Sequence, residues 1–273
     1  MIPAAFDYVC AESAEEAVAL LADHGDDAKL LAGGHSLLPL MKLRLATPSA
    51  LIDIGRVADL SYIEERGDEI AIGALARHHD LEVSPLLREQ VPLLAYTAHQ
   101  VGDPQVRHRG TLGGTLAHGD PASDLPAAVL ALGGTLVAQG PDGRREIAAV
   151  DFFRGFLETA LAPDEMLVEI RVPKVGDAGW SFQKFNRRAQ DWAIVGVAAV
   201  LTEHTGIALI NMGSTPLRAG AVEHALRGGA APSEAAVAAD EGTDPPSDIN
   251  ATSEYRRHLA TVLVRRALEE ANS

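Results

Sequence analysis

AKLLAGGHSLLPLMKLRL, residues 28–45, is the stretch that decides the fold of the first part of this chain. A short apolar run leads into Gly33 and Gly34, and His35 and Ser36 precede an apolar stretch with helical spacing. We interpret the pattern as a strand, a turn and a helix. Because glycine adopts φ > 0 without steric cost, consecutive backbone N–H groups can point into one concavity, and Ser36 adds a hydroxyl. The stretch predicts an anion-binding loop.

A second glycine pair lies in Thr111-Leu112-Gly113-Gly114-Thr115, before AHGDPASD (117–124) and another helical pattern. Either pair alone is also typical of an ordinary tight turn. Two anion-binding loops can hold a diphosphate from both sides. We therefore expect either two unrelated turns or one diphosphate site built from both.

Length and composition exclude several classes of protein. The 273 residues, of which 47% are hydrophobic, are enough for two domains or for one large domain with a small addition. The net charge of −15 argues against nucleic acid or an anionic membrane surface as a partner. With Cys10 alone, the chain can build neither a disulfide framework nor a thiolate-held iron–sulfur cluster.

Targeting signals are missing from the opening residues, which lack the basic and apolar regions of an export signal. No apolar run reaches the roughly 18 residues that a membrane span needs. We expect a cytoplasmic protein that meets the inner face of the membrane, if at all, through partners.

The patterning predicts an α+β protein. Residues 4–10 are expected to form an edge strand, and Ser13 with Glu16 is typical of a capping box at a helix start. Further strands are expected at 28–31, 51–54, 62–65, 69–72, 134–138, 144–148 and 166–172, with helices at 77–83, 86–100 and 122–132. The polar, glycine-bearing segment 174–179 predicts a domain boundary. Beyond it we expect a three-stranded antiparallel sheet (179–187, 194–202, 207–212) and helices at 218–227, 233–239 and 252–271.

The whole chain resembles the FAD-binding medium subunit of molybdenum hydroxylases, the xanthine dehydrogenase family, and is closest in appearance to the aerobic carbon monoxide dehydrogenase type. The residues that carry the resemblance are AGGHSLLPLMKLRLATPSALIDIGRV (32–57), QVGDPQVRHRGTLGGTLAHGDPASDLPAAVLAL (100–132), FDY (6–8), VEIRVP (168–173) and FQKFNRRAQDWAIVGVAA (182–199). It implies an FAD-binding domain of the vanillyl-alcohol-oxidase/PCMH type at 1–173, with subdomains 1–56 and 57–173. A C-terminal α+β domain of the carbon monoxide dehydrogenase flavoprotein type follows at 177–273.

The resemblance also implies which residues contact FAD. They are Lys29, Leu30, Leu31, Ala32, Gly33, Gly34, His35, Ser36, Leu37, Val101, Thr111, Leu112, Gly113, Gly114, Thr115, Asp124, Leu167 and Lys184. Backbone N–H groups of 32–36 and 111–115 are expected to bind the diphosphate, with Lys29 as a cationic neighbour. Related chains often carry Asn where this chain has Thr115, so one donor to the cofactor is lost or replaced through water.

The remaining candidates have specific expected roles. Asp124 is expected to accept from ribose hydroxyls, and Lys184 to stabilise negative charge on the reduced flavin ring. Leu167 and Trp192 are expected to pack near the cofactor. Each also has an ordinary explanation, since Asp124 suits a helix N-terminus, Lys29 and Lys184 suit a solvated surface, and the apolar pair suits a core.

Histidine offers two competing interpretations. His78, His79, His99, His108 and His118 have spacings that fit no common metal-ligand set, so we expect no metal site. No Ser-His-Asp order, acid pair or activated cysteine stands out, so we expect no catalytic residues. In flavin oxidases of the same broad fold, a histidine in a loop like that of His35 can bond covalently to the flavin. The rest of the chain resembles the non-covalent branch, so we expect non-covalent FAD.

By resemblance, the chain is the FAD-carrying electron-transfer subunit of a heterotrimeric molybdenum hydroxylase and does not turn over substrate alone. Electrons would come from two [2Fe–2S] centres in a small partner subunit, after oxidation at a Mo-pterin cofactor in a large one, and pass to an external acceptor. A dimer of heterotrimers is expected. Alternatives are the same subunit of an N-heterocycle (purine, nicotine) or aldehyde hydroxylase, a stand-alone FAD oxidase, and a module that has lost FAD.

Overall fold

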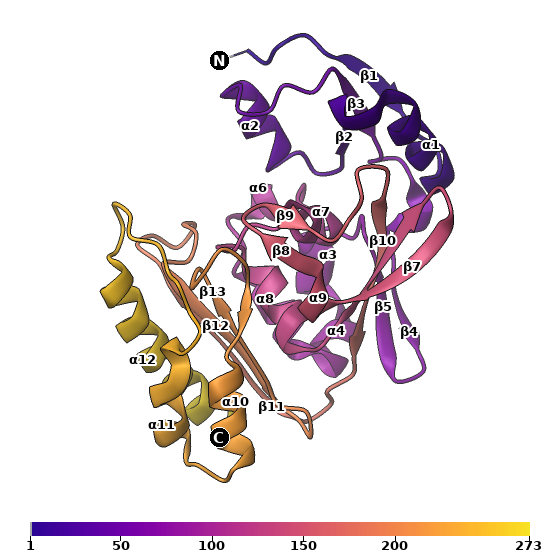
Figure 1. The fold of residues 1–273 in the computed structure, drawn as a ribbon. Coiled ribbons are helices and arrows are strands. Elements are labelled where there is room, and N and C mark those ends of the chain that lie inside the picture. The colour runs from indigo at the N-terminus through magenta and orange to yellow at the C-terminus, as the bar shows by residue number, and fades with distance from the viewer. Residues whose placement is uncertain (1) are drawn as a thin grey trace.

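The computed structural model describes residues 2–273, which form three successive units (Figure 1). The first is a parallel sheet of β1 (Asp7–Cys10), β2 (Ala28–Leu31) and β3 (Ala50–Asp53) in the order β1-β3-β2, with α1 (Ala14–His24), a 3₁₀ turn η1 (Gly25–Asp27) and α2 (Leu37–Lys42). Ser13 accepts from the backbone N–H of Glu16 at the start of α1, as predicted. The strand at 28–31 is confirmed, and the expected edge strand at 4–10 is present but begins only at Asp7.

The middle unit contains a five-stranded antiparallel sheet in the order β4-β5-β10-β6-β7. Its strands are β4 (Ile63–Arg66), β5 (Glu69–Gly73), β6 (Thr135–Gly140), β7 (Gly143–Ala148) and β10 (Met166–Pro173), and η2 (Ala58–Leu60) precedes them. Its helices are α3 (His78–Val83), α4 (Pro85–Gln90), α5 (Pro92–His99), α6 (Pro104–Arg107), α7 (Leu112–His118), α8 (Asp124–Ala131) and α9 (Ala149–Phe152), and a hairpin joins β8 (Phe153–Gly155) to β9 (Glu158–Thr159).

The last unit is an antiparallel sheet of β11 (Gly179–Phe185), β12 (Val195–Leu201), β13 (Gly206–Ile210) and β14 (Leu217–Arg218). The sheet has four strands rather than the predicted three, because the short edge strand β14 pairs with β13. The helical elements α10 (Gly220–Arg227), α11 (Pro232–Ala235), η3 (Ala236–Asp240) and α12 (Ser253–Ala271) complete the unit, and α12 packs against β11 and β12.

Two further expectations about helices were wrong. The helix predicted at 86–100 is two helices, because Val91 lies outside helical geometry (φ −143°, ψ 59°) before Pro92. A residue before proline is pushed away from the helical region by the ring, so Pro92 starts a new helix. The second glycine pair was expected in a loop, yet it lies in the first turn of α7, which Thr111 caps.

The C-terminal sheet is held between helices on both faces. Alternate residues of β12 point in opposite directions, with Val195 and Val197 in the core beneath α12 and Ala198 and Val200 in the core shared with α5 and α8. A side chain at Gly206 would place its Cβ 1.8 Å from the carbonyl oxygen of Ala131 in α8, so contact there is direct. Because the sheet packs against the middle unit, residues of β11 also lie against α5.

None of the helices within residues 2–273 combines the length and the apolar character needed to cross a membrane.

Candidate cofactor-binding site

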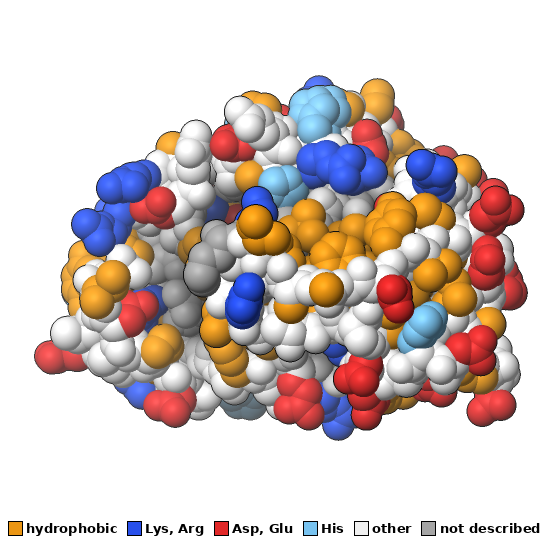
Figure 2. Space-filling model, turned by 90° about the horizontal axis from the view of Figure 1, so that it is seen from above, with side chains coloured by type: hydrophobic (Ala, Val, Ile, Leu, Met, Phe, Trp, Pro, Cys, Tyr) orange, Lys and Arg blue, Asp and Glu red, His pale blue; other side chains and the backbone are white. Residues whose placement is uncertain are grey.

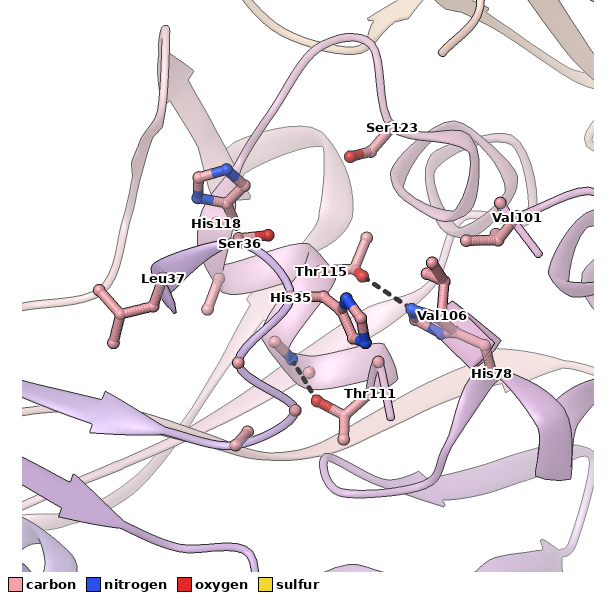
Figure 3. A pocket seen from close by; sticks show the side chains of 18 of the residues that line it. His35, Ser36, Leu37, His78, Val101, Val106, Thr111, Thr115, His118 and Ser123 are labelled. Atoms are coloured by element: carbon pink, nitrogen blue, oxygen red, sulfur yellow. Dashed lines mark hydrogen bonds between the residues drawn. The ribbon is translucent and has the colours of Figure 1, made fainter. Parts of the chain in front are cut away.

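A cavity of about 470 Å³ lies where all three units meet. This volume is within the range of small-molecule and cofactor sites. The first unit contributes the segment from Lys29 to Leu37, and the C-terminal unit contributes Lys184 and the loop residues Gln190–Trp192. Figure 3 shows the wall formed by residues of the first glycine turn and of α3 and α7.

The first glycine turn joins β2 to α2 and offers unused backbone donors. Gly34 has φ 77°, a left-handed conformation that favours glycine, and the N–H of Leu38 donates to the Gly34 carbonyl (3.0 Å) as α2 begins. A Cβ at Gly33 would lie 2.2 Å from the carbonyl oxygen of Arg109. Within residues 2–273, the backbone N–H groups of 33–36 donate to no protein acceptor. They are therefore available to an anionic ligand.

The second glycine pair differs from the expectation, because its backbone donors are already used inside the protein. These bonds run from Leu112 N to Ala76 O (3.0 Å), Gly113 N to Ala74 O (2.9 Å), Gly114 N to Thr111 Oγ1 (3.2 Å) and Thr115 N to Thr111 O (3.0 Å). Neither glycine of this pair has a positive φ. Hydrogen bonds to the segment after β5 and to the capping threonine thus occupy the groups that we expected on the diphosphate.

Close packing is the physical reason for glycine at the second pair. A Cβ at Gly113 would lie 2.6 Å from the Ala74 Cβ and 2.7 Å from the Ala74 carbonyl oxygen. A Cβ at Gly114 would lie 2.7 Å from Thr111 Oγ1 and 4.0 Å from the Ala32 Cβ. The start of α7 therefore sits against both the segment that follows β5 and the first turn.

A buried histidine stands behind Thr115. The Nε2 atom of His78 lies 3.1 Å from Thr115 Oγ1, and His78 is only 2% exposed (Figure 3). Burial, together with smaller contributions from the nearby His35, Arg107 and Arg77, lowers the pKa of His78 to about 4. The imidazole is therefore neutral at pH 7. Its Nδ1 atom is enclosed and has no hydrogen-bond partner among the described residues.

Two of the candidate ligands form an ion pair with each other. Lys184 Nζ of β11 lies 2.7 Å from Asp124 Oδ2 at the start of α8, and each side chain is 7% exposed. The ammonium also donates to the Gln100 carbonyl oxygen (3.1 Å). Burial raises the pKa of Asp124 to about 6, and the attraction of Lys184 opposes this rise. The other carboxylate oxygen, Oδ1, is buried without a partner and remains able to accept from a ligand.

All the other residues expected to bind the cofactor also line the cavity, except Leu112. Leu112 is fully buried in the core of the middle unit. Trp192 lines the cavity and is 58% exposed, so it is not an ordinary core residue.

Two histidines that the sequence suggested only as possible metal ligands, His78 and His118, also line this cavity. Among residues 2–273 no group of three or more His, Cys, Asp or Glu side chains could hold a metal ion.

Three polar wall residues, Ser123, Gln190 and Asp191, were not predicted for the site. Ser123 lies within the quoted stretch 117–124 and is 6% exposed, so its place between Asp120 and Asp124 was a usable signal. No local pattern distinguishes Gln190 and Asp191, because the fold brings their loop to the cavity. The wall as a whole suits a ligand with an anionic group at the glycine turn and an apolar portion beside Leu167 and Val101.

Comparisons with known proteins show the family to which the chain belongs. Residues 4–175 match the family described as the FAD binding domain in molybdopterin dehydrogenase, and residues 180–271 match the carbon monoxide dehydrogenase flavoprotein C-terminal domain. The chain is 44% identical to the carbon monoxide dehydrogenase medium chain of Hydrogenophaga pseudoflava, covering 99% of this chain and 98% of that one. It is 39% identical to the alpha subunit of the 6-hydroxypseudooxynicotine dehydrogenase complex of Paenarthrobacter nicotinovorans, covering 99% and 96%.

The fold comparison gives the same result. A chain of the Hydrogenophaga pseudoflava carbon monoxide dehydrogenase, solved in a form lacking the Mo-pyranopterin moiety of its molybdenum cofactor, superposes with a TM-score of 0.97 at 46% identity. The match covers 99% of this chain and 98% of that chain.

Proposed function

Because the chain belongs to the family of FAD-binding subunits of molybdopterin dehydrogenases, we propose that it is the FAD-carrying medium subunit of a carbon monoxide dehydrogenase-type molybdenum hydroxylase. The observation that carries this proposal is the turn at 33–36, whose unused N–H groups line a cavity shared by all three units. When bound, FAD supplies the ability to accept electrons and pass them on. The chain's own residues bind and orient it.

The residues that line the cavity have different roles in binding and orienting FAD. The 33–36 turn provides donors for the diphosphate, and the exposed Lys29 beside it provides positive charge. The unpartnered Oδ1 of Asp124 can accept from a hydroxyl of the ligand. The ammonium of Lys184 is kept in place by Asp124 and the Gln100 carbonyl, so a positive charge is held at the cavity wall. Such a charge favours a flavin ring that gains electrons.

Electrons must reach this flavin from other polypeptides. The chain has a single cysteine, and a [2Fe–2S] cluster needs four ligands of the thiolate or imidazole kind. We infer a small cluster-bearing subunit and a large molybdenum subunit as partners, assembled as a dimer of heterotrimers. Large apolar side chains are exposed on several elements, and Figure 2 shows apolar side chains gathered in a band across one face. Such surfaces are typical of protein contacts.

We propose in addition that residues 1–173 and 177–273 are separate domains, with subdomains 1–56 and 57–173. The break between β10 and β11, and the two family matches on either side of it, support this division. The cytoplasmic location stays a prediction.

Absorbance of the purified chain tests the cofactor. We expect a flavin spectrum and, after acid precipitation, all of the yellow colour in the supernatant. Colour retained in the pellet would show covalent attachment and would identify His35 as the residue to replace. A folded chain that binds no FAD would refute the proposal.

Affinity isolation from the native cell tests the partners and the substrate. We expect a small cysteine-rich subunit and a large molybdenum subunit to be recovered with the chain. Assays of the complex with carbon monoxide, purines, N-heterocycles and aldehydes would then name the substrate. A chain isolated alone that turns over a substrate by itself would instead be a stand-alone flavin oxidase.

A further inference from the structure

His78 and Thr115 form a contact between α3 and α7 at the cavity wall. The ring of His78 is 2% exposed and lies against the backbone of Gly110, where an added Cβ would lie 2.6 Å from both Cδ2 and Nε2 of the ring. The backbone N–H of His78 also donates to the Gly110 carbonyl oxygen (3.0 Å). The 3.1 Å contact from Nε2 to Thr115 Oγ1 is thus set by the packing of the protein.

The environment of His78 decides which ring nitrogen carries the proton. A neutral imidazole has one N–H donor and one acceptor nitrogen. Nδ1 is enclosed, has no partner among residues 2–273 and is not accessible to a ligand in the cavity. Buried donors without an acceptor are rarer than acceptors without a donor. The proton is therefore on Nε2, and His78 donates to Thr115 Oγ1.

This hydrogen bond directs the hydroxyl proton of Thr115. Since Oγ1 accepts from His78, its own proton must point elsewhere, and the described residues offer it no other acceptor. Thr115 lines the cavity, and its neighbour Gly114 faces Ala32 at the start of the first turn. A free threonine hydroxyl can rotate between donating and accepting, whereas this one is held as a donor on the cavity side.

We propose that His78 is a positioning residue that holds the Thr115 hydroxyl as a hydrogen-bond donor to the diphosphate of FAD. The inference rests on the proposed function. It assigns a role to a histidine whose sequence context suggested only a rejected metal site. It also explains how a hydroxyl serves as a donor in a segment whose backbone N–H groups are occupied.

A double-mutant cycle on the full chain tests the proposal. The chain is freed of flavin and titrated with FAD, and melting of the flavin-free protein is measured separately to follow folding. His78→Leu and Thr115→Val should each weaken FAD binding about tenfold or more, as expected for loss of a hydrogen bond to a charged group. The double variant should be no weaker than Thr115→Val alone, because both changes remove the same donor.

Conservative variants and ligand fragments separate positioning from a general structural role. His78→Gln, which keeps a donor near the Nε2 position, and Thr115→Ser, which keeps the hydroxyl, should bind FAD within about threefold of the unmodified chain. ADP, which carries the diphosphate, should lose affinity in His78→Leu by the same factor as FAD, whereas riboflavin should not. The matched control is Thr97→Val, which removes a buried hydroxyl bonded to the Leu93 carbonyl oxygen (2.8 Å) away from the cavity.

The control should melt at a lower temperature and keep its FAD affinity. Additive losses in the double variant, or an equal loss for riboflavin, would overturn the positioning role. His78→Leu with unchanged FAD affinity would overturn it too. These outcomes all require that the unmodified chain binds FAD, so they are distinct from a failure of the proposed function, in which the unmodified chain binds none.

Discussion

The two glycine pairs are nearly identical in sequence and opposite in structure. At Gly33-Gly34 the chain leaves a strand, takes a left-handed φ of 77° at Gly34 and keeps its N–H groups unused. At Gly113-Gly114 the chain is already helical, and every N–H from Leu112 to Thr115 is bonded within the protein. Glycine thus serves a donor-bearing turn in one region and close helix packing in the other. Under the proposed function, we therefore expect the backbone contacts with the diphosphate from the first pair, and only a side-chain contact, from Thr115, beside the second.

The largest effect is expected from Gly33→Ala. Its Cβ would lie 2.2 Å from the Arg109 carbonyl oxygen and 3.0 Å from the Gly110 Cα, both backbone atoms, so the donor-bearing turn must move. We expect FAD affinity to fall by more than a hundredfold, which corresponds to about 3 kcal/mol. Titration of the folded, flavin-free variant measures this loss. Affinity equal to that of the unmodified chain would show that the first pair does not form the diphosphate site.

Acidification should lower the free energy of unfolding through His78, which contacts Thr115 beside the second glycine pair. Its folded pKa of about 4 is below the unfolded value of 6.5, so the unfolded chain binds the proton more readily. The contribution of His78 to stability is therefore complete above about pH 6.5 and is lost as the pH falls towards 4, by roughly 3 kcal/mol in total. Asp124, with its pKa raised to about 6, acts in the opposite direction.

The difference between the unmodified chain and His78→Gln isolates the histidine from Asp124. Denaturant unfolding at several pH values should show the two stabilities converging between pH 6.5 and 4. Parallel curves would mean that His78 does not titrate differently in the folded and unfolded states.

Gly113→Ala should destabilise the fold by about 2 kcal/mol, because its Cβ meets the Ala74 Cβ and carbonyl oxygen at 2.6 and 2.7 Å and α7 must shift away from the sheet. The loss should appear mainly as a lower unfolding free energy, and FAD affinity should fall less than in Gly33→Ala. The comparison between the two pairs fails if this variant is as stable as the unmodified chain but no longer binds FAD.

The smallest effect is expected from Thr111→Val. The change removes the side-chain acceptor of the Gly114 N–H (3.2 Å) at the start of α7, and loss of such a cap costs about 1 kcal/mol. Thermal unfolding should report this decrease, and FAD affinity should remain within about threefold. A loss comparable to that of Thr115→Val would instead place the Thr111 hydroxyl on the ligand.

Much of the fold was predictable from the sequence because its signals are local. The capping pair Ser13 and Glu16, the strand at 28–31 and the meander that begins at residue 179 depend on periodicity and on neighbouring residues. The break in the helix predicted at 86–100 was also readable, since Pro92 stands in the middle of it.

The chemistry of the second glycine pair was not readable in this way. Two glycines in succession favour a turn over a helix by propensity, yet α7 begins there because the carbonyl groups of Ala74 and Ala76 accept from its first N–H groups. Those acceptors come from a segment more than thirty residues earlier in the chain. A local pattern contains no information about them.

The sequence by itself indicated an anion-binding turn at 33–36, because a glycine pair between a strand and a helix is a local pattern. The other expected FAD contacts, such as Asp124 and Lys184, were implied by the resemblance to a family. The tertiary structure alone decided which of those residues contact one another and which donors are left free for a ligand. It paired Lys184 with Asp124 across the boundary between units, and it placed a buried histidine behind Thr115. Both contacts join residues far apart in the chain, and their geometry follows from the packing of helices between two sheets rather than from any local preference.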